Sequence, residues 1–292
     1  MRVLVTGAHG LLGAEFVRVV QGEGWDAVPL GREDLDVTDS GAVDARILEE
    51  SPDWIVHCAA YTAVDRAEED PELAMRVNRD GAANVAGAAA RAGARTVYIS
   101  SDYVFDGEQR IPYGTGDAVG PLSVYGKTKL AGEVAVAHAA SEVASGAVTR
   151  LPLIVRTGWL YGASGNNFVT AILARAEAGG ALRVVDDQRG RPTWAANVAS
   201  VVVNLMTSGV DGIWHVADGD DATWLDFARE VVRIRGLDVP VQGVSTDDWG
   251  AEAPRPRYSV LDLTSTESAV RHPMMGWREA LRVYLDTPTT GC

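Results

Sequence analysis

The residues of this 292-residue chain that are best suited to chemistry are a tyrosine and a lysine within the run 123–133. If that run is helical, Tyr125 and Lys129 stand four residues apart and share one face of the helix, whereas Lys127 points elsewhere. A free phenol has a pKa of roughly 10 and is a poor proton donor at neutral pH, and a fixed positive charge beside it would lower that pKa. The spacing therefore predicts a tyrosine acid with a lysine neighbour. Because many helices contain this spacing by chance, the prediction depends on the rest of the chain.

A hydroxyl group stands where a second donor to the same substrate is needed. Segment 95–100 has the composition of a strand and leads into Ser101, Asp102 and Tyr103. A hydroxyl at the carboxyl end of that strand can meet Tyr125 across a crevice and bond the same substrate oxygen. Asn78, in the helical run 75–92, either supports this site or is a hydrogen-bonded polar group of the core.

A glycine-rich turn near the start of the chain is typical of a dinucleotide site. The strand-like run 2–6 leads into Gly7-x-x-Gly10-x-x-Gly13, and an apolar helix pattern continues through Val20. Gly7 would permit the tight turn, Gly10 would let a pyrophosphate approach the backbone, and Gly13 would let the helix lie close to the sheet. The pyrophosphate would then meet the free N–H groups at the start of the helix. The alternative is a glycine-rich turn without a ligand, since Gly-x-Gly-x-x-Gly is the commoner spacing.

The second strand, 27–30, predicts which cofactor is bound. The usual NAD-binding fold has a carboxylate after this strand, whereas here the first charge is Arg32, which suits a 2′-phosphate and favours NADPH. Glu33 and Asp34 follow at once, so NADH also remains open. Segment 35–39 is predicted as a third short strand edge, in which Asp36 either contacts the adenine or caps the helix that begins near Ser40.

The order of the predicted elements indicates the fold class. Apolar runs at 54–60, 95–100 and 151–156 predict buried parallel strands. We expect an α/β fold, a Rossmann-like doubly wound parallel sheet with a smaller C-terminal α/β substrate lobe. The predicted dinucleotide-binding domain comprises 1–157 and returns at roughly 190–217, and the lobe comprises 158–189 and 218–292. Runs 108–122 and 139–147 are predicted as loops.

Composition limits the classes of partner. With 40 acidic and 26 basic residues the formal charge is −14, which would repel nucleic acid and anionic membranes. The N-terminal apolar run is too short for a signal peptide and no run is long enough to span a membrane, so we expect a cytoplasmic protein. Cys58 and Cys292 form neither a disulfide framework nor a metal set, and we predict no metal site.

Five stretches of the chain resemble a known family. The glycine turn, Ser101-Asp102-Tyr103 and Tyr125-x-x-x-Lys129, in this order, resemble the extended short-chain dehydrogenase/reductase superfamily. Within it, the chain is similar to the dTDP-4-dehydrorhamnose reductase family at 58–65, 100–107, 124–133, 155–161 and 187–193. The last two stretches, in the predicted substrate lobe, point to the reductase. The similarity fades around the second strand, at 139–149 and in the last fifteen residues.

The resemblance implies the nicotinamide-dependent reduction of the 4-keto group of a dTDP-linked 6-deoxyhexose. By position, Tyr125 would protonate the developing alkoxide, and Ser101 would donate a hydrogen bond to the carbonyl oxygen. Lys129 would lower the pKa of Tyr125 and hold the nicotinamide ribose. The family usually has threonine where this chain has Ser101, which keeps the hydroxyl. Such chemistry needs two donors where negative charge develops, and a phenol and a hydroxyl meet that need.

The predicted site residues fall into three overlapping groups. The catalytic residues are Ser101, Tyr125 and Lys129. The cofactor-binding residues are Gly7, His9, Gly10, Leu11, Leu12, Gly13, Arg32, Asp36, Val37, Ala59, Ala60, Tyr61, Tyr125 and Lys129. The substrate-binding residues are Ser101, Asp102, Tyr103, Trp159, Asn167, Arg189, Arg191 and Arg257. Arg255 is a further candidate beside these arginines for the substrate pyrophosphate, and the alternative for each arginine is a solvated side chain.

Other functions are compatible with parts of the pattern. A sugar-nucleotide 4,6-dehydratase is disfavoured, because its pattern has Thr-Asp-Glu where this chain has Ser101-Asp102-Tyr103. An epimerase would keep the same serine and tyrosine. A non-catalytic binding protein, like the regulatory subunit of methionine adenosyltransferase, resembles the same family, but it would not need Ser101, Tyr125 and Lys129. The identity of the keto-sugar and the choice between monomer and homodimer stay open.

Overall fold

The computed structural model describes residues 1–143 and 151–287. Its centre is a parallel sheet of six strands in the order β10-β5-β4-β3-β1-β2. These strands are β1 (Arg2–Thr6), β2 (Asp26–Leu30), β3 (Trp54–His57), β4 (Arg95–Ser101), β5 (Leu153–Thr157) and β10 (Gly212–His215). Parallel strands are covered on both faces, which explains the continuous apolar runs of β3 and β5. The predicted doubly wound α/β fold is confirmed.

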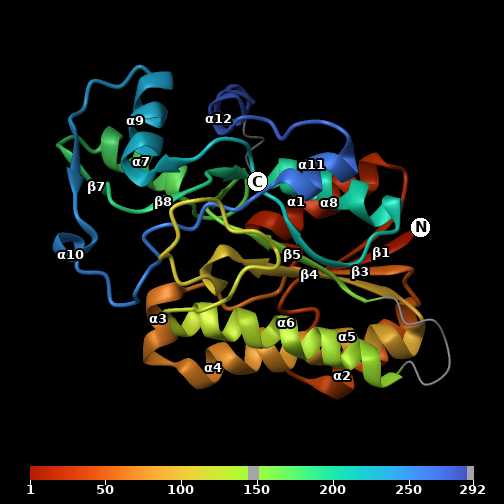
Figure 1. The fold of residues 1–292 in the computed structure, drawn as a ribbon. Coiled ribbons are helices and arrows are strands. Elements are labelled where there is room, and N and C mark those ends of the chain that lie inside the picture. Colours follow the sequence, from red (N-terminus) through yellow and green to blue (C-terminus); the bar gives the residue numbers. More distant parts are fainter. Residues whose placement is uncertain (144–150, 288–292) are drawn as a thin grey trace.

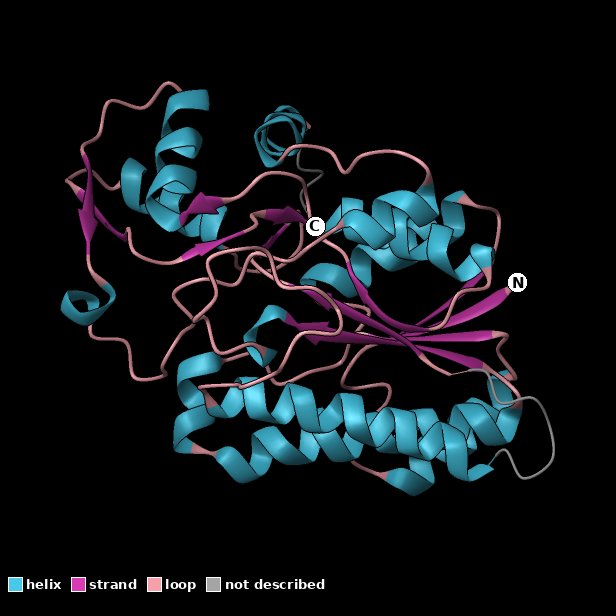
Figure 2. Ribbon diagram, in the orientation of Figure 1, coloured by secondary structure: helices cyan, strands magenta, loops and turns pink. Residues whose placement is uncertain are grey.

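Helices cover both faces of this sheet, as Figures 1 and 2 show. One layer contains α2 (Ser40–Glu50), α5 (Gly81–Ala92) and α6 (Val124–Val143), and the other contains α1 (Leu11–Gly22), α8 (Ala195–Ser208) and α11 (Thr264–Val270). A chain of short helices leads into α5, comprising α3 (Val64–Glu69), α4 (Pro71–Met75) and the π-helical turn Arg76–Asp80. A 3₁₀ turn, Asp102–Val104, follows β4. The carboxyl ends of the strands therefore open onto α3, this turn and the start of α6.

The remaining elements form a second, smaller body at the upper left of Figure 1. Its core includes Tyr161, Phe227 and Trp277, all fully buried. Its elements are β6 (Leu160–Tyr161), α7 (Phe168–Glu177), β7 (Leu182–Val185), β8 (Arg189–Gly190), β9 (Thr193–Trp194), β11 (Ala222–Thr223), α9 (Trp224–Ile234), β12 (Val241–Val244), α10 (Thr246–Trp249) and α12 (Trp277–Asp286). We keep the domain limits given above as a prediction. In the returning segment 190–217, β10 pairs with β5 and α8 packs on α1. Helix α11 lies in the segment predicted for the lobe, but it packs on α8 and β10 of the larger body.

Two local predictions are wrong. Segment 35–39 forms turns and not a strand edge, because the Asp36 carboxylate accepts the N–H and hydroxyl of Thr38 and closes a local turn. Residues 139–143 continue α6, since alanine favours a helix wherever nothing interrupts it. The rest of the predicted loop, 144–147, lies outside the described residues. No helix among the described residues is long and apolar enough to cross a membrane.

A buried ion pair fastens α6 to the sheet. The guanidinium of Arg156 on β5 donates to both carboxylate oxygens of Glu133 on α6, at 2.9 and 2.7 Å, and Ser100 on β4 donates to the same carboxylate. The two charged side chains are 3% and 5% exposed. A bidentate pair with a third donor satisfies the buried charges, whereas either ion alone would be left without compensation.

We expect Arg156→Met to lower the free energy of unfolding by about 3–5 kcal/mol, because it leaves the Glu133 carboxylate buried without its counterion. Urea denaturation followed by circular dichroism would measure this loss. The control is Arg91→Met, which removes an exposed pair with Asp44 and should cost less than about 1 kcal/mol. Equal losses in the two variants would contradict the role of the buried pair.

Candidate active site

The glycine turn between β1 and α1 is a cradle of bare backbone. Gly7 has φ +64°, and a Cβ there would lie 2.7 Å from the Ala59 nitrogen, while a Cβ at Gly13 would lie 2.2 Å from the Gly7 oxygen. Only glycine allows this turn and this close contact. No side chain caps α1, and its first turn contains no acidic residue. The start of α1 thus offers N–H groups and a positive dipole end to an anion, and this geometry fits a dinucleotide pyrophosphate.

The region beyond β2 contains the residues expected at the adenosine end of a cofactor. The ring of His9 lies over Gly31, where a Cβ would be 2.4 Å from Nδ1. Arg32 is exposed, and the Asp34 carboxylate accepts the Gly31 N–H at 2.8 Å and so belongs to the turn. Val37 packs against Gly81 of α5. The polar and charged groups that could select a 2′-phosphate therefore lie on one exposed turn.

Asp36 is held by its own turn. The hydrogen bonds from the Thr38 backbone and side chain lower the pKa of Asp36, and the charges of Arg32 and Arg76 add to this effect. Helix α2 is capped by Asp39, so the alternative role of Asp36 as that cap is wrong. Arg76, which no sequence motif indicated, is exposed and acts electrostatically on the same carboxylate from the π-helical turn.

Asn78 connects the loop after β3 to α6. Its side-chain oxygen accepts the Tyr61 N–H at 2.8 Å, and its Nδ2 donates to the Tyr61 carbonyl at 3.1 Å and to Thr128 Oγ1 at 2.9 Å. It lies in the π-helical turn, a feature often found at functional sites. Asn78 is thus a fully bonded buried group that also fixes the backbone of Tyr61 beside α6, so the two interpretations of this residue are compatible.

Tyr125 and Lys129 both lie on α6, as the sequence predicted, and Lys129 is 2% exposed. Its Nζ stands 4.2 Å from the ring centroid of Tyr98, whose hydroxyl donates to the Lys129 carbonyl at 3.2 Å. Burial lowers the pKa of Lys129 to about 7, against the opposing effects of Glu133 and Cys58. No role was predicted for Glu133, although it stands four residues after Lys129 and so shares its helix face.

The expected lowering of the phenol pKa is wrong for this structure. Burial raises the pKa of Tyr125 to about 12, with a smaller opposing effect from Ser101 and a further rise from Asp102. Burial destabilises the phenolate of Tyr125 by more than the hydrogen bond with Ser101 stabilises it. The Lys129 amine lies over the ring of Tyr98. Tyr125 therefore keeps its proton at neutral pH, as a proton donor must before it acts.

Ser101 and Asp102 stand opposite Tyr125 at the end of β4. The Ser101 hydroxyl accepts the Tyr103 N–H at 3.1 Å and donates to Asp102 Oδ1 at 3.1 Å. Burial raises the pKa of Asp102 to about 6, although hydrogen bonds from serine hydroxyls oppose the rise. The Tyr103 ring meets the Tyr125 ring edge to face at 5.7 Å. The structure thus brings together Ser101, Asp102, Tyr103 and Tyr125 as one site.

Trp159 forms an aromatic wall with a partner that the sequence analysis missed. It lies parallel to Trp224 at 3.5 Å between ring centroids, and a Cβ at Gly190 would be 2.4 Å from its indole. Trp159 has φ +53°, which is unusual for a bulky residue and indicates that its surroundings hold it there. The Trp224 indole nitrogen donates to Gln188 Oε1 at 3.2 Å. No spacing rule links Trp159 to Trp224, so only the fold reveals this pair.

The four candidate arginines already have partners within the chain. Arg189 pairs with Asp221, and Arg191 donates to the carbonyls of Leu261 and Asp220 at 2.8 and 2.9 Å. Arg255 makes a bidentate pair with Asp65 at 3.0 and 2.8 Å.

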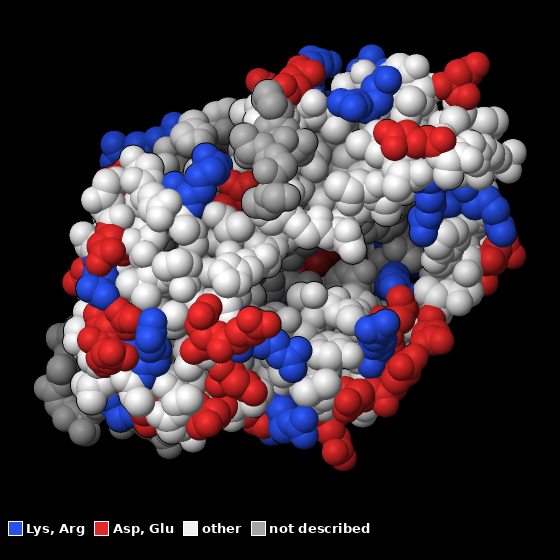
Figure 3. Space-filling view, turned by 180° about the vertical axis from the view of Figure 1, so that it is seen from behind, with Lys and Arg blue, Asp and Glu red and all other residues white. Residues whose placement is uncertain are grey.

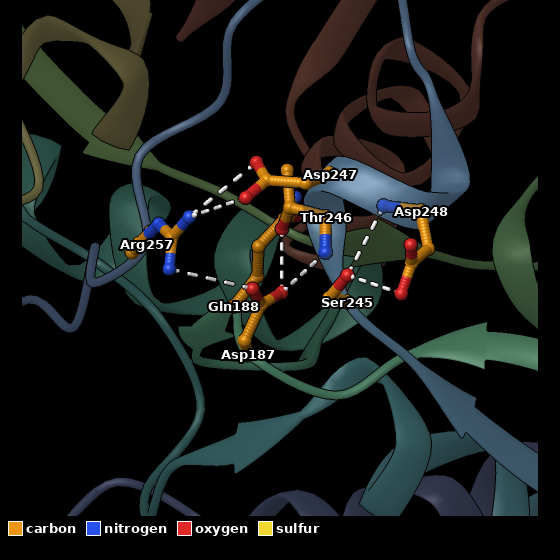
Figure 4. Close-up of polar contacts among 7 residues, drawn as sticks. All are labelled: Asp187, Gln188, Ser245, Thr246, Asp247, Asp248 and Arg257. Carbon is orange, nitrogen blue, oxygen red and sulfur yellow. Dashed lines mark hydrogen bonds and ion pairs between the residues drawn. The ribbon is translucent and has the colours of Figure 1, made fainter.

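Figure 4 shows the fourth, Arg257, between Asp187 and Asp247, at 3.6 and 3.5 Å. Asn167 caps α7 and donates to the Gly162 carbonyl. On the face in Figure 3, which is hollowed near its centre, basic side chains are scattered among acidic ones. At these four positions an anionic ligand would therefore meet arginines that already have partners.

Comparison with known proteins places these features in a family. A family model described as the RmlD substrate binding domain matches residues 1–289. The chain belongs to the dTDP-4-dehydrorhamnose reductase family. It is 40% identical over 286 residues to a dTDP-4-dehydrorhamnose reductase of Streptomyces griseus, covering 96% of this chain and 91% of that protein.

Two further relatives indicate the range of the family. A dTDP-4-keto-6-deoxy-D-glucose reductase of Streptomyces niveus is 38% identical and covers 96% of this chain, which spans 95% of it. A crystal structure of dTDP-4-dehydrorhamnose reductase from Bacillus anthracis in complex with NADP superposes with a TM-score of 0.91 at 36% identity, covering 97% of this chain and 98% of that one. The sequence matches and the superposed structure therefore assign nearly the whole chain to the same family and fold.

The pKa of Lys129 can be tested directly, because the chain has only two lysines. Protein labelled with ¹³C at the lysine ε-carbon should give two signals in NMR, and that of Lys129 should titrate with a midpoint near 7. The amine is charged below this pH and neutral above it, since burial disfavours the charged form. Lys127→Arg assigns the signals by removing the exposed one. A midpoint near 10 for Lys129 would show that burial does not lower its pKa.

Proposed function

We propose that this chain uses NADPH to reduce the 4-keto group of a dTDP-linked 4-keto-6-deoxyhexose. The observation that carries the proposal is the meeting of the Tyr125 phenol and the Ser101 hydroxyl after β4, at the same carboxyl edge of the parallel sheet as the glycine cradle after β1. The names of the family members point to the same substrate class. The individual sugar stays open, because relatives of similar identity are named for different 4-keto substrates.

The cofactor would lie along the carboxyl ends of β1, β2 and β3. The glycine turn and α1 would bind its pyrophosphate, Arg32 its 2′-phosphate, and Lys129 its nicotinamide ribose. Residues Ala59, Ala60 and Tyr61 would close over it, with Tyr61 held in place by Asn78. Bound NADPH supplies the hydride for the reduction.

The chain itself would stabilise the oxygen of the carbonyl group. As that oxygen gains negative charge, Tyr125 gives it the proton held on Oη and Ser101 donates a hydrogen bond to it. Tyr125 is partly shielded from water and already carries its proton, whereas the Ser101 hydroxyl would turn its hydrogen from Asp102 Oδ1 to the substrate oxygen. Trp159 and Trp224 would bound the substrate on the lobe side, and Asp102 and Tyr103 would line its sugar.

The purified chain should consume NADPH when supplied with a dTDP-4-keto-6-deoxyhexose, as followed by NADPH absorbance. Product analysis by NMR after turnover of several such sugars would identify the preferred substrate. A non-catalytic binding protein would leave the absorbance unchanged, and an epimerase would change the sugar without net consumption of NADPH. Either result would overturn the proposal.

We expect Tyr125→Phe to lower kcat by at least about a hundredfold, because it deletes the proton donor, while NADPH affinity changes little. Steady-state kinetics and NADPH titration would measure the two quantities. Tyr284→Phe is the matched control, since it removes a phenol group that donates to the Gly162 carbonyl in the core of the smaller body. An unchanged kcat in Tyr125→Phe would exclude the phenol as the donor.

We expect Arg32→Ala to raise the KM for NADPH roughly tenfold to a hundredfold and to affect NADH far less, since a hydrogen bond to a charged group is lost only with NADPH. Initial rates with the two cofactors would provide the comparison. Arg183→Ala, which removes an exposed arginine on β7, is the control. Equal losses with NADPH and NADH would rule out the 2′-phosphate assignment.

A further inference from the structure

Tyr98 is a buried phenol between the sheet and α6. It lies on β4, is 0% exposed, and its hydroxyl reaches the carbonyls of Asn78 and Lys129 at 3.3 and 3.2 Å. A Cβ at Gly132 would lie 2.1 Å from this hydroxyl, so α6 approaches it through bare backbone. The ring of His57 stacks on the Tyr98 ring at 6.0 Å between centroids. Contacts from β3, α6 and the π-helical turn therefore fix where the ring of Tyr98 lies.

The ring of Tyr98 supports the amine of Lys129. The Nζ atom of Lys129 stands 4.2 Å from the ring centroid, well within the roughly 6 Å over which a cation is attracted to an aromatic face. Lys129 is 2% exposed, so its ammonium has little water around it and the attraction is stronger than on a surface. Burial raises the pKa of Tyr98 well above its ordinary value, so the group that faces the ammonium is a neutral ring and not a phenolate.

The other titratable groups around Lys129 lie at the end of β3 and on α6, and they are His57, Cys58, Tyr125 and Glu133. Burial lowers the pKa of His57 to about 3 and raises the pKa of the Cys58 thiol, so neither is charged at neutral pH. Tyr125 keeps its proton for the same reason. Glu133 favours the charged amine, but its two carboxylate oxygens accept from Arg156. The ring of Tyr98 therefore adds an attraction that does not depend on a neighbouring charge.

A charged Lys129 would bind a cofactor more firmly than a neutral one. Burial disfavours the ammonium and lowers the pKa of Lys129, so the amine is charged below this pKa and neutral above it. Hydrogen bonds from a charged donor are roughly twice as strong as those from a neutral one. A group that stabilises the ammonium therefore extends the pH range in which the nicotinamide ribose would be held firmly.

We propose that Tyr98 is a positioning residue for the reduction, whose ring keeps the Lys129 side chain charged and in place where the nicotinamide ribose would bind. This inference rests on the proposed function. Tyr98 lies buried beneath Lys129 and acts through it. The strand that ends in Ser101 thereby contributes a second group to the site, from earlier along the same strand.

The test changes the electron density of the ring with little change in its size. Tyr98→Phe removes the hydroxyl and keeps the aromatic face, whereas Tyr98→trifluorophenylalanine, introduced by amber suppression, has fluorine atoms that withdraw electrons from that face. Relative to Tyr98→Phe, we expect the ¹³C midpoint of Lys129 to fall by about half to one pH unit in the fluorinated variant, because the charged form loses its support. Tyr98→Phe itself should keep the wild-type midpoint.

Kinetics should follow the same midpoint, since kcat/KM reports ionisations of the free enzyme. In the fluorinated variant, the basic inflection of kcat/KM for NADPH should move to lower pH by the same amount as the NMR midpoint. Between the two midpoints kcat/KM should be lower than in Tyr98→Phe, by up to about tenfold, because less of Lys129 is charged.

The control is Tyr284→trifluorophenylalanine, which places the same ring in the core of the smaller body. It should keep the Lys129 midpoint of wild type. A midpoint that stays or rises in the fluorinated Tyr98 variant, or that falls equally in the control, would overturn the inference.

The NMR measurement separates this inference from the proposed function, because it needs no turnover. If wild type consumes no NADPH but the midpoint falls as expected, the proposed function fails and the support of Lys129 by Tyr98 stands. If wild type is active but the midpoint does not fall, the role of Tyr98 fails alone.

Discussion

The close approach of α6 to β4 is the constraint on which the site depends. Two glycines make it possible, because a Cβ at Gly126 would lie 2.3 Å from the Tyr103 carbonyl and one at Gly132 would lie 2.1 Å from the Tyr98 hydroxyl. At this distance the helix face that bears Tyr125 and Lys129 lies against the sheet, which buries Lys129 and partly shields Tyr125 from water. The same burial raises one pKa and lowers the other, so both side chains favour their neutral forms.

The cost of burying charge next to this face is offset by neighbouring groups on α6 and the sheet. Glu133 opposes the fall in the pKa of Lys129 and is itself neutralised by Arg156, while the ring of Tyr98 lies under the amine. Arg189, Arg191, Arg255 and Arg257 follow the same rule, since each is paired with a carboxylate or a carbonyl. In a chain with a formal charge of −14, these arginines are thus held in specific contacts, and the start of α1 adds a positive dipole end without any side chain.

Local sequence was sufficient where short-range geometry decides the structure. Tyr125 and Lys129 share a face because helix periodicity requires it, and the glycine turn lies between β1 and α1 because no other residue type fits there. Three features could not be predicted, since each depends on contacts between distant segments: the stacking of Trp159 on Trp224, the pairing of Arg255 with Asp65, and the amount by which burial outweighs charge at Tyr125. The wrong strand edge at 35–39 arose because a side-chain turn at Asp36 competes with strand pairing.

Segment 255–259 connects the smaller body to the larger one through hydrogen bonds and ion pairs close to the site. Arg255 is bonded to Asp65 on α3, and Ser259 is bonded to Asp102 after β4, while Arg257 lies against Asp187 of the lobe. If the lobe and this segment moved away from the sheet together, the bonds to Asp65 and Asp102 would both break, whereas the pair of Arg257 with Asp187 would remain. Since breaking a buried hydrogen bond to a carboxylate is costly, the arrangement favours one relative position of lobe and sheet. The orientation of the Asp102 carboxylate beside Ser101 therefore depends on the segment packed against the lobe as well as on the turn that follows β4.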